Sequence, residues 1–180
     1  LGKSDWCILE ADESDGSFVH VPATYCIITN IDREHMDFYK SVNDLKKLFI
    51  KFINKVPSFG KSFICIDDKY NNELIKKIKI KNYYTYGTNP KSQFYIKNIK
   101  LAKKFSEFDL SIKLPGKKNT LIKKIKIPLL GIHNIRNSTA AAAVASTIGI
   151  PRKIIKQGLK EFKGVQRRFN KIFTYRETSF

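Results

Sequence analysis

The chain has few cysteines, few acidic residues and no long hydrophobic run, and each shortage argues against a class of protein. Cys7, Cys26 and Cys65 lack the spacing of a metal site, and each lies in an apolar run. We therefore expect buried free thiols, which suit a reducing cytoplasm. No run of 18 apolar residues and no basic-then-apolar leader is visible. We therefore expect a cytoplasmic protein without membrane insertion.

Acidic residues are outnumbered, because 34 lysines and arginines stand against 16 aspartates and glutamates, for a net charge of +18. Such a charge can mark a nucleic-acid-binding surface. The lysines, however, are scattered among isoleucines and asparagines, as at Lys76-Lys77 and Lys123-Lys124, and no nucleic-acid motif accompanies them. We expect no nucleic-acid partner, and a basic nucleic-acid-binding module remains an alternative.

The pattern up to residue 80 predicts alternating strands and helices in a chain long enough for one domain with a core. Strands are expected at 24–29 and 61–66, and helices at 41–55, capped by Ser41, and at 72–80. This alternation indicates an α/β fold with a mostly parallel sheet flanked by helices.

From residue 83 to 127 short apolar runs predict a small antiparallel subsheet, with strands at 94–99, 108–113 and 121–127. The aromatic residues at its start could stack on a base, but core packing is the favoured interpretation. Two helices are expected to follow, at 133–148 before Gly149 and at 151–162. Residues 172–175 are typical of a final strand or a linker.

Two polar blocks follow strand-like runs. The first, Glu10 to Asp15, comes after the apolar run 6–9, and the second, Thr29 to Asp37, comes after the strand expected at 24–29. Ligands of open α/β sheets bind beyond the carboxyl ends of the strands, so Glu10 and His35 could reach one site. A carboxylate and an imidazole are both ligands for a divalent ion. Without further support, a solvated acidic loop and a structural histidine would be the simpler interpretations.

The two blocks read E-A-D-E-S-D and T-N-x-x-x-E-H-M-D, and two more blocks follow them in order, G-I-H-N-I-R-N at 131–137 and G-V-Q-R-R-F at 164–169. Together they resemble the central domain of the Mur ligases over most of the chain. The resemblance implies that residues 1–165 form the central ATP-binding domain without its upstream phosphate loop. Residues 166–180 would then be a linker toward a missing carboxyl-terminal domain.

The resemblance also implies roles for individual residues. Glu10 would help to hold the Mg²⁺ that bridges the ATP phosphates, and His35 a second Mg²⁺ near the substrate carboxylate. Glu34 stands where the family usually has Asp. Arg168 would reach the nucleotide phosphates, so His35 and Arg168 are the expected catalytic residues. The residues expected to hold the adenine are His133, Asn134 and Asn137.

The activity that the resemblance implies is that of an ATP-dependent ligase of peptidoglycan precursor synthesis. It would use ATP and Mg²⁺ to join L-alanine to UDP-N-acetylmuramate through an acyl phosphate. Because the chain starts without Met and lacks the phosphate loop, we expect an internal piece that is inactive alone. Besides the nucleic-acid-binding module, two alternatives stay open. One is a sister ligase that attaches a recycled peptide to the same sugar nucleotide, and the other is a non-catalytic scaffold.

Overall fold

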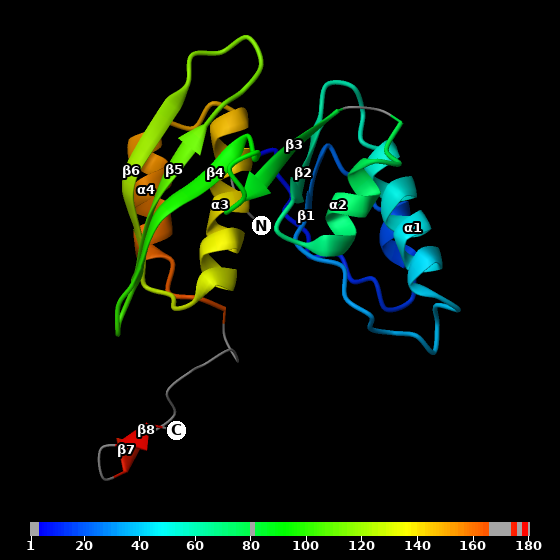
Figure 1. Cartoon of the computed structure of the whole chain (residues 1–180), viewed down its shortest axis with the longest axis horizontal. Helices are drawn as coiled ribbons and strands as arrows, with labels where there is room; N and C mark the ends of the chain where they lie inside the picture. Colours follow the sequence, from blue (N-terminus) through cyan, green and yellow to red (C-terminus); the bar gives the residue numbers. More distant parts are fainter. Residues whose placement is uncertain (1–3, 80–81, 166–173, 176–177, 180) are drawn as a thin grey trace. The chain divides into compact units, whose positions relative to one another are not determined.

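A computed structural model describes residues 4–79, 82–165, 174–175 and 178–179 of the chain. The chain forms two compact units, residues 1–93 and residues 94–180. Figure 1 shows the elements of each unit. The predicted change of architecture lies close to this division, and each unit contributes its own strands and helices.

The first unit is built on three parallel strands. β1 (Tyr25–Ile28) pairs with β2 (Lys61–Cys65), which pairs with β3 (Tyr83–Gly87). Helices α1 (Val42–Asn54) and α2 (Lys69–Ile75) connect the strands, and a short 3-10 helix, η1 (Ser17–His20), precedes them. Ser41 caps α1 by accepting a hydrogen bond from the backbone N–H of Asp44, as the sequence predicts.

The core of the first unit lies between one face of these strands and the helices. Strands alternate their side chains between two faces, so Cys26 and Ile28 of β1 point toward this core. Phe18 of η1 packs there against the rings of Phe49 and Phe52 from α1. The opposite face carries a row of aromatic rings whose neighbours lie 5.7 to 6.5 Å apart between centroids: Trp6, Tyr25, Phe63 and Tyr84.

The second unit is an antiparallel sheet covered by two helices. The sheet consists of β4 (Phe94–Leu101), β5 (Ser106–Ile112) and β6 (Thr120–Ile127). Helix α3 (Ile132–Thr147) packs against β4 and β5, while α4 (Arg152–Glu161) lies along β6. Two short strands, β7 (Thr174–Tyr175) and β8 (Thr178–Ser179), pair further along the chain. Ala140, Ala142 and Ala143 are buried, which lets α3 approach the sheet closely.

These observations confirm the predicted fold class, a parallel sheet flanked by helices with an antiparallel subsheet. Some boundaries differ from the prediction. The sequence predicts that the run 83–87 belongs to the antiparallel part, yet it is the third parallel strand, and the ring of Tyr86 is fully buried. Helix α2 begins at Lys69 instead of Asn72, because the Asp68 side chain accepts the Asn71 N–H and caps the helix earlier.

The strand predicted for residues 6–9 is also wrong. These residues belong to no strand, and Trp6, Ile8 and Leu9 are 52%, 96% and 63% exposed. An apolar run forms a strand only where a neighbouring strand pairs with its backbone, and no strand of the described residues pairs with residues 6–9. As a consequence Cys7 is exposed, against the prediction, whereas Cys26 and Cys65 are buried free thiols as expected.

Candidate functional site

The acidic block at residues 12–17 is a tight loop built by its own aspartates. The backbone N–H of Ser14 donates to the Asp12 carboxylate at 2.7 Å, and that of Ser17 donates to Asp15 at 2.9 Å. Hydrogen bonds from the backbone and the side chain of Ser14 hold the pKa of Asp12 below its ordinary value, and hydrogen bonds from the side chain and the backbone of Ser17 do the same for the pKa of Asp15. Gly16 closes the loop with φ +71°, a left-handed conformation that favours glycine. Asp12 and Asp15 therefore shape the loop.

His35 lies in the loop after β1, in a backbone conformation that is uncommon for a histidine. Its φ is +54°, and its carbonyl accepts hydrogen bonds from the N–H groups of Phe38 and Tyr39 at 3.0 and 2.9 Å. Ile31, which is 1% exposed, anchors the same loop in the core. The imidazole thus projects from a turn that is fixed at both ends.

The structure brings His35 to the acidic loop, but to Glu13 instead of Glu10. The His35 Nε2 lies 3.9 Å from the Glu13 Oε1, and each side chain is 38% exposed. Glu34 joins them, and the donor atoms of the three residues lie within 4.8 Å of one another. Two carboxylates and an imidazole are donors that suit a divalent cation, so the residues present fit the expected metal.

Glu10 is exposed and lies outside this group of three donors. Glu13 lies inside the acidic block, and the sequence predicts no role for it. The sequence does contain a pattern that indicates the position of Glu13. Asp12-x-Ser14 and Asp15-Gly16-Ser17 are both patterns in which an aspartate accepts the N–H two residues on. They indicate a tight loop after Glu10. In such a loop the side chains point in other directions than they would at the end of a strand.

The residues predicted to hold adenine lie at the start of α3. Asn134 and Asn137 are three positions apart and share a face of the helix, while Ile135 is fully buried in the core. The Asn134 Nδ2 donates to the carbonyl of Leu130 at 2.7 Å, which ties the helix to the segment before it. His133 and Asn137 are exposed. Arg168, the predicted phosphate-binding residue, lies outside the described residues.

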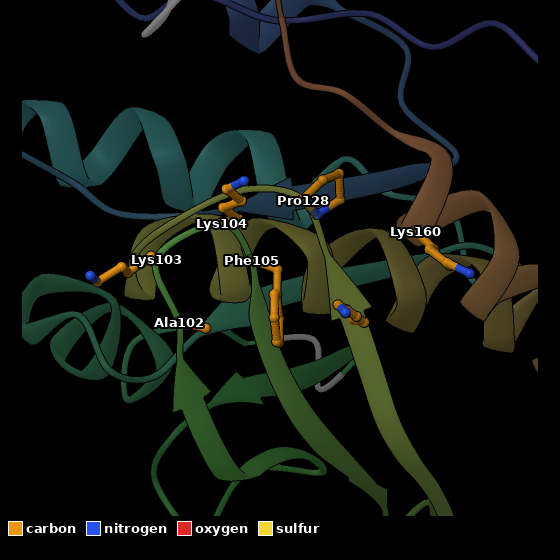
Figure 2. A pocket seen from close by; sticks show the side chains of 7 residues that line it. Ala102, Lys103, Lys104, Phe105, Pro128 and Lys160 are labelled. Atoms are coloured by element: carbon orange, nitrogen blue, oxygen red, sulfur yellow. The ribbon is translucent and has the colours of Figure 1, made fainter. Parts of the chain in front are cut away.

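A basic hollow of about 550 Å³ lies in the second unit, at the turn between β4 and β5 and the ends of β6 and α4. The Lys126 Nζ sits 3.7 Å from the centre of the Phe105 ring. In Figure 2 the side chains of Lys103 and Lys160 extend in different directions and do not converge on one point. Among the described residues, none of those predicted for the site lines this hollow.

In the part of the chain that the structure describes, no helix combines the length and the apolar composition that a membrane crossing requires.

Comparison with known proteins gives one consistent result. Residues 2–145 match the model of the Mur ligase middle domain. The chain is 79% identical, over all 180 residues, to the UDP-N-acetylmuramate–L-alanine ligase of Pelagibacter ubique (strain HTCC1062), and covers 39% of that protein. It is 39% identical over 177 residues to the enzyme of the same name from Bartonella quintana (strain Toulouse), covering 98% of the chain and 37% of that protein.

Among solved structures, the UDP-N-acetylmuramate–alanine ligase of Thermotoga maritima superposes with a TM-score of 0.71. The superposition covers 93% of this chain and 35% of the other, at 24% sequence identity. At that identity the likeness concerns the fold. The chain spans less than two fifths of the length of the curated relatives that it matches.

Proposed function

This chain belongs to the Mur ligase family, and from that premise we propose that it serves a protein that joins L-alanine to UDP-N-acetylmuramate with ATP. The observation that carries the proposal is the 79% identity, over the whole chain, to a ligase named for this reaction. In the proposed reaction ATP phosphorylates the lactyl carboxylate of UDP-N-acetylmuramate. The amine of L-alanine attacks the acyl phosphate, and ADP, phosphate and the alanyl product leave.

His35 and Glu10 are the residues that we assign to Mg²⁺. When bound, Mg²⁺ would supply charge neutralisation and alignment for the phosphoryl transfer. His35 presents its Nε2 on the outer side of a fixed turn, with the carboxylate of Glu13 nearby, and this supports its assignment. Glu10 keeps its role from the family motif alone, as the exposed carboxylate directly before the acidic loop.

His133, Asn134 and Asn137 are the residues that we assign to adenine. A carboxamide offers both a donor and an acceptor, which matches an edge of the base. The position of Asn134 and Asn137 on one face at the start of α3 supports this role. We assign the phosphates to Arg168, because a guanidinium binds phosphate oxygens through two hydrogen bonds. A cytoplasmic location is proposed with the function.

The test is an assay of the full-length protein with ATP, Mg²⁺ and UDP-N-acetylmuramate, in which either L-alanine or a recycled tripeptide is the acceptor. We expect product with L-alanine, and a loss of about 100-fold or more in kcat/KM in His35→Ala and Glu10→Ala, since each removes a proposed metal ligand. Turnover with the tripeptide alone would assign the protein to the sister ligase. Absence of any nucleotide binding would favour a non-catalytic scaffold.

The 180-residue chain alone is expected to be inactive, because it covers 39% of the length of the ligase that it matches over all its residues. Incubation of the chain with ATP, Mg²⁺, UDP-N-acetylmuramate and L-alanine should give no ADP above background. Turnover by the isolated chain would contradict this expectation.

A further inference from the structure

Tyr39 connects the two loops that form the candidate metal site. Its side chain is 3% exposed, and its hydroxyl donates a hydrogen bond to the backbone carbonyl of Glu13, which lies 26 residues earlier in the chain. Burial raises the pKa of the Tyr39 hydroxyl, and the negative charges of Glu13, Asp15 and Asp12 act in the same direction.

The backbone of the same residue contacts the other loop. The N–H of Tyr39 donates to the carbonyl of His35 at 2.9 Å. One residue thus holds His35 through its main chain and Glu13 through its side chain. Because the phenol ring is buried, neither loop can move away from the other without breaking one of these hydrogen bonds or exposing the ring.

The consequence is the distance between two possible metal ligands. Mg²⁺ binds its ligands at about 2.1 Å, so two ligands of one ion lie at most about 4.2 Å apart. The 3.9 Å between the His35 Nε2 and the Glu13 Oε1 falls inside this limit. Glu34 lies within 4.8 Å of both, and this bound is wider than the limit.

We propose that Tyr39 is a positioning residue of the His35 metal site, holding the backbone of Glu13 so that the Glu13 carboxylate shares a divalent cation with the imidazole. The inference rests on the proposed function, since it assumes that His35 binds a metal. It goes beyond that proposal by naming the carboxylate that joins His35 and the residue that places it there.

Three substitutions in the 180-residue chain separate this role from simple packing. Tyr39→Phe keeps the buried ring and removes only the hydroxyl. Glu13→Gln keeps the size of the side chain and removes the charge. Tyr70→Phe removes a hydroxyl from α2 in the same unit, where the ring lies under the Lys46 ammonium group, and serves as the matched control.

The first measurement is a Mn²⁺ titration followed by electron paramagnetic resonance, with line broadening of the His35 ring signals in NMR. We expect broadening of the His35 signals in the unsubstituted chain and a loss of about 10-fold in Mn²⁺ affinity in both Tyr39→Phe and Glu13→Gln, the size usual for a residue that orients metal ligands. Tyr70→Phe should change the affinity less than about 2-fold.

The second measurement does not need the metal. Hydrogen exchange of the Gly16 amide, which donates to the Glu13 carbonyl at 3.1 Å, reports on the acidic loop itself. It should accelerate in Tyr39→Phe while the amides of α1 stay protected, because only the loop loses its anchor. Unchanged exchange at Gly16 overturns the proposed role of Tyr39.

The possible results distinguish the role of Tyr39 from the metal binding of His35 on which it depends. Binding of Mn²⁺ that His35→Ala abolishes, but that Tyr39→Phe leaves unchanged, overturns the role of Tyr39 alone. Absence of Mn²⁺ binding that depends on His35 overturns the metal site, and the role of Tyr39 with it.

Discussion

Asn71 joins the ends of two parallel strands with a single buried side chain. Its Nδ2 donates to the carbonyl of Thr29 after β1 at 3.2 Å and to that of Cys65 at the end of β2 at 3.0 Å. The residue is fully buried. Because Thr29 opens the loop that carries His35, this amide contributes to the geometry of the candidate metal site.

Replacing Asn71 by Ala should lower the free energy of unfolding by about 2 kcal/mol, because the carbonyls of Thr29 and Cys65 lose a buried donor. Asn72→Ala is the matched control. Asn72 also donates to two carbonyls, those of Ile66 and Asp68, but it is exposed and water can replace it. Its loss should be under about 1 kcal/mol. Urea unfolding of both variants measures the difference, and equal losses would contradict the role given to Asn71.

For single residues, the sequence predicts which side chain could bind a metal ion better than it predicts which side chain lies next to it. His35 was singled out from its motif, and the structure places it beside a carboxylate. The partner is Glu13 instead of Glu10, because two aspartate-built turns redirect the acidic block. Such turns depend on hydrogen bonds between neighbours in the chain, whereas the expected strand at 6–9 depended on a distant partner. Local chemistry was the better guide here.

At the scale of elements, Asp109 connects two irregular positions in the antiparallel sheet. Asn98 in β4 and Lys124 in β6 both have φ +53°, and the pairing shifts near each of them. Asp109 lies between them in β5. Its carboxylate accepts the Lys124 N–H at 2.7 Å and the Asn98 Nδ2 at 2.8 Å. The bulges are therefore fixed by one side chain in the central strand of this sheet.

Lys124→Gly should be neutral or stabilising. A left-handed backbone costs a lysine about 1 kcal/mol, and glycine adopts it without strain while keeping the N–H that Asp109 accepts. Lys123→Gly, one residue earlier and also exposed, should cost about 1 kcal/mol, because the φ of Lys123 is not positive and glycine there only adds freedom to the unfolded chain. Thermal unfolding gives the melting temperatures of the two variants. A lower melting temperature for Lys124→Gly than for Lys123→Gly would refute the explanation.

The Asp109 carboxylate should also make stability depend on pH. Burial raises its pKa, but the hydrogen bonds from Lys124 and Asn98 outweigh that effect, so the pKa lies below the ordinary value of 3.8. A carboxyl group with a lowered pKa in the folded state stabilises the fold above its unfolded pKa. This stabilisation is lost as the pH falls through the folded pKa.

We therefore expect the unsubstituted chain to be more stable than Asp109→Asn at pH 7, and the difference to shrink below about pH 4. Urea unfolding at pH 7 and pH 3 gives both values. Glu107→Gln, in the same strand, controls for the loss of one negative charge. A difference that grows on acidification would show that the sign is wrong.

Elements were predicted most reliably where the apolar pattern and a capping signal agreed. Both hold for α1, with its stripe of buried residues and its Ser41 cap, and for α3, which ends before Gly149 at φ +89°. The pattern could not decide the pairing partner of the run 83–87. A strand of aromatic and β-branched residues pairs equally well in either direction, and only the course of the chain after α2 makes it parallel to β2.

At the scale of the whole molecule, the family could be predicted from four short blocks, whereas the charge could not be interpreted from composition. The family model covers residues 2–145, which include three of the four blocks. Four lysines line the hollow near Phe105, and in Figure 2 the side chains of Lys103 and Lys160 extend in different directions.

A net charge of +18 nevertheless attracts any polyanion, so binding to DNA at low salt is not by itself a function. Non-specific binding through lysines gives a dissociation constant of about 10⁻⁴ to 10⁻⁶ M at physiological salt. It weakens steeply as salt is added, because the release of counterions from the DNA then yields less free energy. We expect the chain to fall in this range, with the same affinity for unrelated sequences. His35→Ala and Glu10→Ala should leave it unchanged, because neither removes a positive charge.

Fluorescence anisotropy with several labelled duplexes and single strands, at salt concentrations from about 50 to 200 mM, measures both quantities. A double variant, Lys103→Gln with Lys104→Gln, tests whether the lysines of the hollow contribute more to DNA binding than other lysines do. The matched control is the double variant Lys76→Gln with Lys77→Gln. Equal small losses of affinity in the two double variants would mean that charge alone is responsible.

A nucleic-acid-binding module predicts instead a preference of about 10³-fold or more for one sequence or structure, and this preference would depend on one pair of lysines. Such a preference would restore the rival function, since a scattered charge has no means of producing it.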